Sequence, residues 1–117
     1  MIVKKPSILI YTYEPEAHTL REICAGIEEE GVFFEIKEQA SCSHTDDARI
    51  HAARFAWQAA QDSMLGSGIG IFRTDIALQM RGLSADRCVE AYYMPTADQC
   101  RKLGANSART IKKMPFK

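Results

Sequence analysis

Short apolar stretches alternate with longer amphipathic ones along this chain. Residues 7–13 are apolar and rich in β-branched and aromatic side chains, which predicts a buried strand. Residues 16–30 instead predict a helix, because their apolar side chains recur every three or four positions and share one face: Leu20, Ile23, Cys24 and Ile27. Gly31 follows directly and is well suited to end that helix.

The same patterns continue to the end of the chain. They predict a strand at 32–36, a helix at 46–62, strands at 69–72, 76–80 and 89–94, and a C-terminal helix. We expect this last helix to form in two pieces, 96–103 and 106–113, separated by Gly104 and Ala105. The glycines within residues 66–68 predict a turn before the third strand.

The order of these elements predicts an α/β fold. A strand–helix–strand–helix–strand start favours parallel strands joined by right-handed crossovers, with helices on both faces of the sheet. The connection at residues 73–75 is so short that the strands on its two sides are expected to run antiparallel. We therefore expect a single domain over residues 1–117, a three-layer α/β/α sandwich whose mixed five-stranded sheet contains one antiparallel strand.

Composition narrows the classes of function. The 117 residues are 46% hydrophobic and 26% charged, values typical of one globular domain. Equal numbers of basic and acidic residues, 15 of each, argue against a nucleic-acid-binding domain, which usually has a basic face. No apolar run approaches the roughly 20 residues that span a membrane, and the N-terminal residues lack the features of a signal peptide. We expect a cytoplasmic protein that binds neither nucleic acid nor membranes.

No group of residues forms a recognisable catalytic set. None of the cysteines is spaced as C-x-x-C, and we expect four reduced thiols: Cys24, Cys42, Cys88 and Cys100. The sequence has no G-x-S-x-G nucleophile motif. The glycines of residues 66–70 precede a strand, with no lysine and hydroxyl pair after them, so a turn is favoured over a phosphate-binding loop. We expect no catalytic residue and no cofactor in the isolated chain, and a role in binding or assembly.

Cys42, His44 and His51 are a candidate metal cluster. Closed zinc sites use about four ligands, whereas only these three candidates lie close together in the sequence. The alternative, which we favour, is a solvated polar loop followed by a histidine on the surface of the second helix.

Three consecutive acids, Glu28, Glu29 and Glu30, end the first predicted helix. The helix dipole disfavours negative charge at this end, so the acids are either solvated or meet a cation or a partner protein. Hard divalent cations such as Mg²⁺ or Ca²⁺ favour carboxylate oxygens. A single carboxylate cannot enclose such an ion, which would therefore be shared with a partner chain.

The C-terminal segment is a basic helix. Arg109, Lys112 and Lys113 are spaced i, i+3 and i+4 and share one face, which is either solvated or a docking surface for an acidic partner. We predict a partner interface formed by both charged sites: Glu28, Glu29, Glu30, Arg109 and Lys112.

Three segments resemble the small subunit of the glycerol and diol dehydratase-reactivating factors, a family related to the dehydratase medium subunit. They are residues 26–34 (GIEEEGVFF), residues 56–60 (AWQAA), and residues 104–109 (GANSAR) with Lys112, Met114, Pro115 and Phe116. Their order and spacing agree with that family over nearly the whole chain. Residues 41–54 form a longer segment than in the family, and residues 87–93 match it poorly.

The resemblance implies a non-catalytic, chaperone-like role. Small subunits of that family act with a large subunit that resembles an Hsp70-type ATPase. Together the two subunits rescue adenosylcobalamin-dependent dehydratases that hold damaged cobalamin. The small subunit exchanges places with the dehydratase medium subunit, while the large subunit binds and hydrolyses ATP. The resemblance also implies that Glu29, in the middle of the acidic run, helps to bind a divalent cation at the contact with the large subunit. The family's fold is a three-layer α/β/α sandwich as well.

Other functions stay open beside this leading hypothesis. The chain could be the medium subunit of a cobalamin-dependent dehydratase, although such chains are longer, or a flavodoxin-like domain that binds a small ligand. Glycerol and diol dehydratase are equally compatible with the sequence as clients. Self-association of the isolated chain and association with a bacterial microcompartment are also compatible with it.

Overall fold

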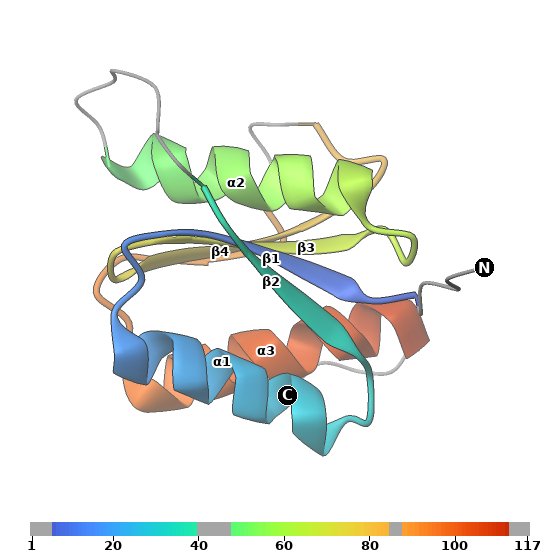
Figure 1. Ribbon diagram of the computed structural model, residues 1–117, viewed down its shortest axis with the longest axis horizontal. Coiled ribbons are helices and arrows are strands. Elements are labelled where there is room, and N and C mark those ends of the chain that lie inside the picture. The colour runs from blue at the N-terminus through green and yellow to red at the C-terminus, as the bar shows by residue number, and fades with distance from the viewer. Residues whose placement is uncertain (1–5, 40–47, 85–87, 113–117) are drawn as a thin grey trace.

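A twisted sheet lies between two layers of helices in the computed structural model, which describes residues 6–39, 48–84 and 88–112 (Figure 1). The elements are β1 (Ile8–Tyr13), α1 (Ala17–Glu29), β2 (Phe34–Glu38), α2 (Ala48–Asp62), β3 (Ser67–Phe72), β4 (Asp75–Met80), β5 (Glu90–Tyr92) and α3 (Ala97–Lys112). Helix α2 covers one face of the sheet, and α1 and α3 cover the other. The three-layer α/β/α sandwich expected from the sequence is confirmed.

The five strands are arranged in the order β2-β1-β3-β4-β5. Strand β1 runs parallel to both of its neighbours, β2 and β3. Strand β4 runs antiparallel to both of its neighbours, β3 and β5. Among the described strands β4 is thus the one antiparallel member, as the short connection between Phe72 and Asp75 predicted.

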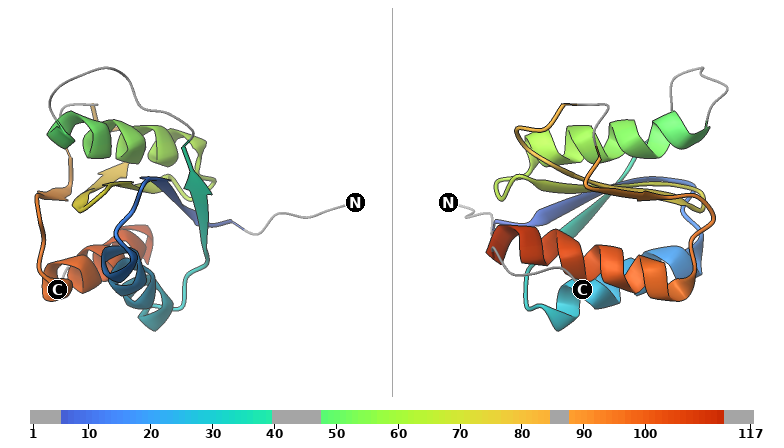
Figure 2. Two further views of the ribbon diagram at one scale, coloured as in Figure 1. Left: turned by 60° about the vertical axis from the view of Figure 1, so that its left-hand side comes forward. Right: turned by 180° about the vertical axis from the view of Figure 1, so that it is seen from behind.

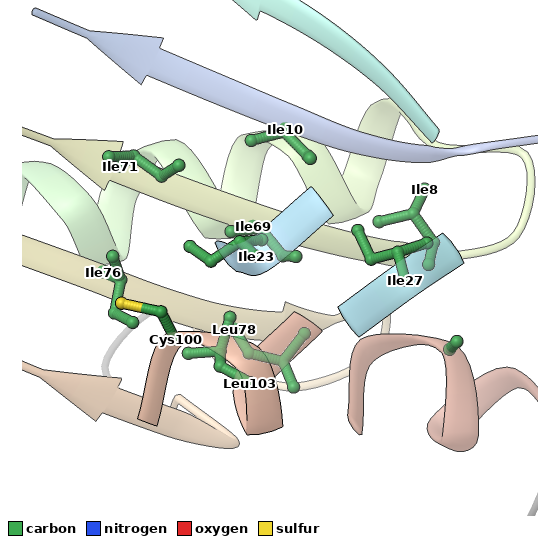
Figure 3. Packing of buried hydrophobic residues seen from close by; sticks show 11 residues of the cluster. Ile8, Ile10, Ile23, Ile27, Ile69, Ile71, Ile76, Leu78, Cys100 and Leu103 are labelled. Atoms are coloured by element: carbon green, nitrogen blue, oxygen red, sulfur yellow. The ribbon is translucent and has the colours of Figure 1, made fainter. Parts of the chain in front are cut away.

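The larger core lies between the sheet and the α1–α3 layer (Figure 3). Because side chains alternate along a strand, every second residue of the central strands points into it. The sheet and the two helices supply fully buried aliphatic side chains: Ile8, Ile10, Ile69, Ile71, Ile76, Leu78, Ile23, Ile27 and Leu103. Each such side chain contributes about 1.5–3 kcal/mol on burial, so this layer supplies most of the hydrophobic stabilisation.

The other face of the sheet is packed more closely, by glycines in β3 against small residues in α2. A Cβ added to Gly70 would overlap the carbonyl oxygen of Ala52 and lie 2.5 Å from the nitrogen of Ala56. A Cβ added to Gly68 would lie 2.6 Å from the carbonyl oxygen of Ala56. The predicted turn is therefore wrong in its extent: only Gly66, with φ +76, turns the chain, and β3 begins at residue 67.

Helix α3 is one continuous helix, so the predicted break at Gly104 and Ala105 is wrong. A Cβ on Gly104 would overlap the carbonyl oxygen of Ile23 in α1 and lie 2.9 Å from its carbonyl carbon. From the other side, a Cβ on Gly26 would overlap the carbonyl oxygen of Arg101 in α3. These two glycines let the helix backbones touch, and the close contact outweighs the weak helix propensity of glycine.

Two strand boundaries also differ from those predicted. Strand β2 begins two residues later than expected, because Gly31 adopts φ +73 and prolongs the turn after α1. Strand β5 is shorter than expected, and the left-handed conformation of Met94, with φ +51, ends it before Pro95. In the part of the chain that the structure describes, no helix is long and apolar enough to cross a membrane.

Ion pairs join the C-terminal ends of α1 and α3. The Glu30 side chain is only 8% exposed and accepts hydrogen bonds from Arg109 (Nη2 to Oε2, 3.2 Å) and Lys112 (Nζ to Oε1, 3.4 Å). Burial is the largest influence on the pKa of Glu30 and raises it, but the hydrogen bonds and charges of Lys112 and Arg109 together hold this pKa below its usual value. The carboxylate is thus stabilised in its ionised form.

We expect Gly104→Ala to destabilise the protein. Overpacking costs about 1–3 kcal/mol, because α1 and α3 must separate to admit the methyl group. The better helix propensity of alanine offsets at most about 1 kcal/mol of this. A fall of about 1–2 kcal/mol in the free energy of unfolding, measured in urea, is the expected result. Lys102→Ala, at an exposed position of α3, is the control and should change stability by less than about 0.5 kcal/mol. Equal stability of the Gly104→Ala and wild-type proteins would contradict the close packing.

We expect the stabilisation by Glu30 to depend on pH. Because the folded-state pKa lies below the unfolded value of about 4.5, the stabilisation is present above that pH and is lost as pH falls through the folded pKa. Glu30→Gln should therefore cost about 1–2 kcal/mol at pH 7 and much less near pH 3. Urea unfolding at both pH values measures this. Glu28→Gln, which removes an exposed charge from the same helix end, should show no such dependence; a Glu30→Gln effect that persists unchanged at pH 3 would refute the assignment.

Candidate functional site

The three consecutive acids at the end of α1 occupy different environments. Glu28 is exposed, the Glu29 side chain is 43% exposed, and Glu30 is nearly buried against α3. Since successive helix residues are 100° apart, the three side chains point in different directions and only part of the run faces solvent. The acidic run is therefore not a uniform solvated patch.

Arg101 of α3 lies between two acids of α1. Its Nη2 is 2.9 Å from Glu22 Oε2, and its Nη1 pairs with Glu29 Oε1. The hydrogen bond that Arg101 donates to Glu22, together with the charges of both acids, raises the pKa of Arg101 above its usual value. The sequence analysis did not single out Arg101 or Glu22. A signal was present, since Arg101 and Lys112 are three helical turns apart and share the face of α3 that meets α1.

Glu29 meets some, but not all, of the requirements of a ligand for a divalent cation. Its carboxylate is half exposed at the end of a helix, and oxygen ligands suit Mg²⁺ and Ca²⁺. Arg101 pairs with one oxygen of the same group, so a bound cation would have to share Glu29 with the guanidinium or displace it. Among the described residues no three His, Cys, Asp or Glu side chains form a metal-binding group, so further ligands would come from elsewhere.

Arg109 and Lys112 lie at the same place as the acidic run. Arg109 is only 18% exposed, and both side chains bind Glu30; the Lys112 Nζ also donates to the carbonyl oxygen of Glu30 at 2.7 Å. The acidic and basic residues, which are 79 and 82 positions apart in the sequence, therefore form one cluster that spans two helix ends. Lys113 lies outside the described residues.

His51 is not on the helix surface, so that expectation is wrong. It is 4% exposed, and its ring stacks on Phe72 with the centroids 4.6 Å apart. Burial of an aromatic ring against β3 accounts for its position at the start of α2. Cys42 and His44, the other members of the candidate metal cluster, lie outside the described residues.

The three described cysteines are poor candidates for nucleophiles. Burial and the charge of Glu28 raise the pKa of Cys24 to about 11. Burial also raises the pKa of Cys88 and of Cys100. Since the thiolate is the reactive form, a raised pKa disfavours these thiols as nucleophiles.

A polar and aromatic cluster at the carboxyl ends of β1 and β3 was not expected from the sequence. The rings of Tyr13 and Phe72 stack with their centroids 5.4 Å apart, and Glu14 pairs with Arg73 at 3.2 Å. Glu14 and Arg73 both adopt left-handed backbone conformations, with φ +45 and +57. In parallel sheets this end commonly carries binding sites, and here it carries two stacked rings and an exposed ion pair.

Comparison with known proteins places the chain in a family. A family model described as dehydratase medium subunit matches residues 5–117. The propanediol dehydratase-reactivating factor small subunit of Salmonella typhimurium is 30% identical over 113 residues, which cover 96% of this chain and 90% of that protein. The probable glycerol dehydratase-reactivating factor small subunit of Citrobacter freundii is 34% identical over 99 residues, which cover 83% of this chain and 79% of that protein.

Solved structures of reactivating factors are also similar to this chain. A chain in the structure of a diol dehydratase-reactivating factor complexed with ADP and Mg²⁺ superposes with a TM-score of 0.84 at 28% identity, covering 97% of this chain and 99% of that one. A glycerol dehydratase reactivase gives the same TM-score and identity, covering 97% of both chains. This chain belongs to the dehydratase medium subunit family and, within it, to the small subunits of the diol and glycerol dehydratase-reactivating factors.

Proposed function

We propose that this chain exchanges places with the medium subunit of an adenosylcobalamin-dependent diol or glycerol dehydratase, and that the exchange releases damaged cobalamin. One observation carries this proposal. A family model described as dehydratase medium subunit covers residues 5–117, whereas the relatives over the same span are named as reactivating-factor small subunits. Two chains that share one fold can offer a partner similar binding surfaces, so each is able to displace the other.

We assign nucleotide binding to a large ATPase subunit. The related diol dehydratase-reactivating factor was solved with ADP and Mg²⁺, which supports a nucleotide site within the assembled factor. In the present chain Gly68 and Gly70 lie within β3 in backbone contact with α2, which leaves no space beside them for a phosphate. The chain then acts as the exchanging component, while the large subunit supplies the energy of ATP hydrolysis.

We assign the contact with the large subunit to the joined ends of α1 and α3. Glu29 offers a half-exposed carboxylate there, and Glu28, the preceding residue, adds an exposed negative charge to the same helix end. Glu29 would ligate a Mg²⁺ or Ca²⁺ ion together with groups of the large subunit. Glu30, Arg109 and Lys112 hold the helix end in place for this contact through their ion pairs.

The match to the dehydratase medium subunit family favours a second candidate function, that of a dehydratase subunit. The chain could serve as a medium subunit in a cobalamin-dependent dehydratase, since that is what the family model describes. Such a subunit would bind cobalamin in complex with the other dehydratase subunits and support turnover. Reconstitution of a dehydratase with this chain in place of its medium subunit, followed by an activity assay, distinguishes the two.

We expect cobalamin release to require this chain. A dehydratase loaded with an inactive cobalamin is mixed with the large subunit, ATP and Mg²⁺, with and without this chain. Cobalamin in the filtrate is followed by its absorbance, and the subunits bound to the dehydratase are identified by mass. Exchange predicts that this chain joins the dehydratase while the medium subunit leaves. Release of cobalamin at the same rate without this chain, or with the medium subunit still bound, would exclude exchange.

We expect Glu29→Gln to weaken binding of the large subunit by about tenfold or more in Mg²⁺, equivalent to about 1.4 kcal/mol. In EDTA, wild type and variant should bind much more alike, because the cation is gone and the carboxylate then differs from an amide only in its exposed pair with Arg101. Affinity is measured by titration under both conditions. Glu28→Gln removes the same charge one residue away and is the matched control; it should keep the wild-type response to Mg²⁺. If Glu29→Gln also keeps that response, Glu29 is not a ligand.

A further inference from the structure

Strand β2 forms one outer edge of the sheet, next to β1 (Figure 2, left). Among the described strands β1 is its one hydrogen-bonded neighbour. At the opposite edge β5 has only three residues, whereas β2 has five. An edge strand presents backbone N–H and C=O groups that can pair with a further strand.

The pairing with β1 determines which backbone groups of β2 point outward. The Ile8 N–H donates to the Phe33 oxygen at 3.0 Å, and the Gln39 N–H donates to the Thr12 oxygen at 2.7 Å. Backbone groups alternate sides along a strand, so the odd-numbered residues between 33 and 39 bond toward β1. The N–H and C=O groups of residues 34, 36 and 38 consequently point away from the sheet.

We propose that two copies of this chain associate edge to edge through β2, antiparallel, about a two-fold axis at Ile36. In this arrangement Ile36 of one copy exchanges both backbone hydrogen bonds with Ile36 of the other. Residue 34 of each copy pairs in the same way with residue 38 of the other. The outward-pointing groups of β2 are then satisfied, and the two sheets become continuous.

The charges of β2 are self-complementary in this register. Glu35 and Lys37 share one face of β2, because they pair in register with Leu9 and Tyr11 of β1. Antiparallel pairing about Ile36 places Glu35 of each copy opposite Lys37 of the other, so two opposite-charge pairs form. They occupy non-hydrogen-bonded positions, where side chains of facing strands come closest, with Cα atoms about 4.5 Å apart.

Neighbouring registers are disfavoured by the same charges. A shift of two residues one way places Glu35 opposite Glu35, and a shift the other way places Lys37 opposite Lys37. Like charges directly opposite one another destabilise a sheet. Ile36 is 41% exposed, and on the axis the Ile36 residues of the two copies would cover each other. An edge strand of an unrelated protein would not need this symmetric pattern, which is why we favour a second copy as the occupant.

The test uses three variants of the full-length chain: E35K, K37E and the double variant E35K/K37E. E35K turns both charge pairs into lysine opposite lysine, and K37E turns both into glutamate opposite glutamate. Sedimentation velocity over a concentration series should show a concentration-dependent dimer for the wild type, weakened by salt because the pairs are exposed. Each single variant should need about tenfold higher concentration to dimerise. A 1:1 mixture of the two single variants, and the double variant alone, should regain dimers.

Two further variants separate this interface from other causes. Ile36→Pro removes the outward N–H on the axis and spares the hydrogen bonds to β1, so it should abolish dimers while the circular dichroism spectrum is unchanged. E28K makes the same charge change as E35K away from β2 and should leave dimerisation unaltered. A wild-type chain that stays monomeric at millimolar concentration overturns the proposal. Dimers that the charge reversals do not weaken, or that the mixture does not restore, overturn it as well; in that case a strand of another protein becomes the expected occupant of this edge.

Discussion

Direct backbone contact between helices and their neighbours is the constraint on which this structure depends. Gly26 and Gly104 let α1 and α3 touch, and Gly68 and Gly70 let α2 lie against β3. At each of these positions a methyl group would collide with main-chain atoms, which cannot move aside as a flexible side chain would. The distance between α1 and α3 within their layer, and the distance of α2 from the sheet, follow from these few residues that have no side chain.

The charged cluster is a consequence of that spacing. Because α1 and α3 lie so close, Arg101 reaches both Glu22 and Glu29, and Arg109 and Lys112 reach Glu30. Negative charge is unfavourable at the C-terminal end of α1, and the cations of α3 compensate for it there. The region to which we assign the large-subunit contact is therefore a seam between two helices rather than the end of one.

The order of the elements, the layers and the antiparallel β4 could be predicted from the sequence, because they follow from periodicity and from connection length. The roles of Gly104 and Gly68 could not be predicted in this way. A glycine has the same local signature in a helix break, in a turn and in a close contact, and only the facing element distinguishes them. His51 was misplaced for a similar reason, since the ring that buries it belongs to another element. The ion pairs of Glu30 join residues 79 and 82 positions apart, for which no local pattern exists.

Arg101 is a cation with two acidic partners, one more exposed than the other. If Glu29 turns toward an ion or another chain, the guanidinium keeps Glu22 and is not left without a counter-charge. Loss of the sole partner of a partly buried charge is costly, whereas loss of one partner of two costs far less. The outer half of this cluster can therefore bind and release a partner while the inner half keeps the two helices together, a property that suits the reversible exchange proposed above.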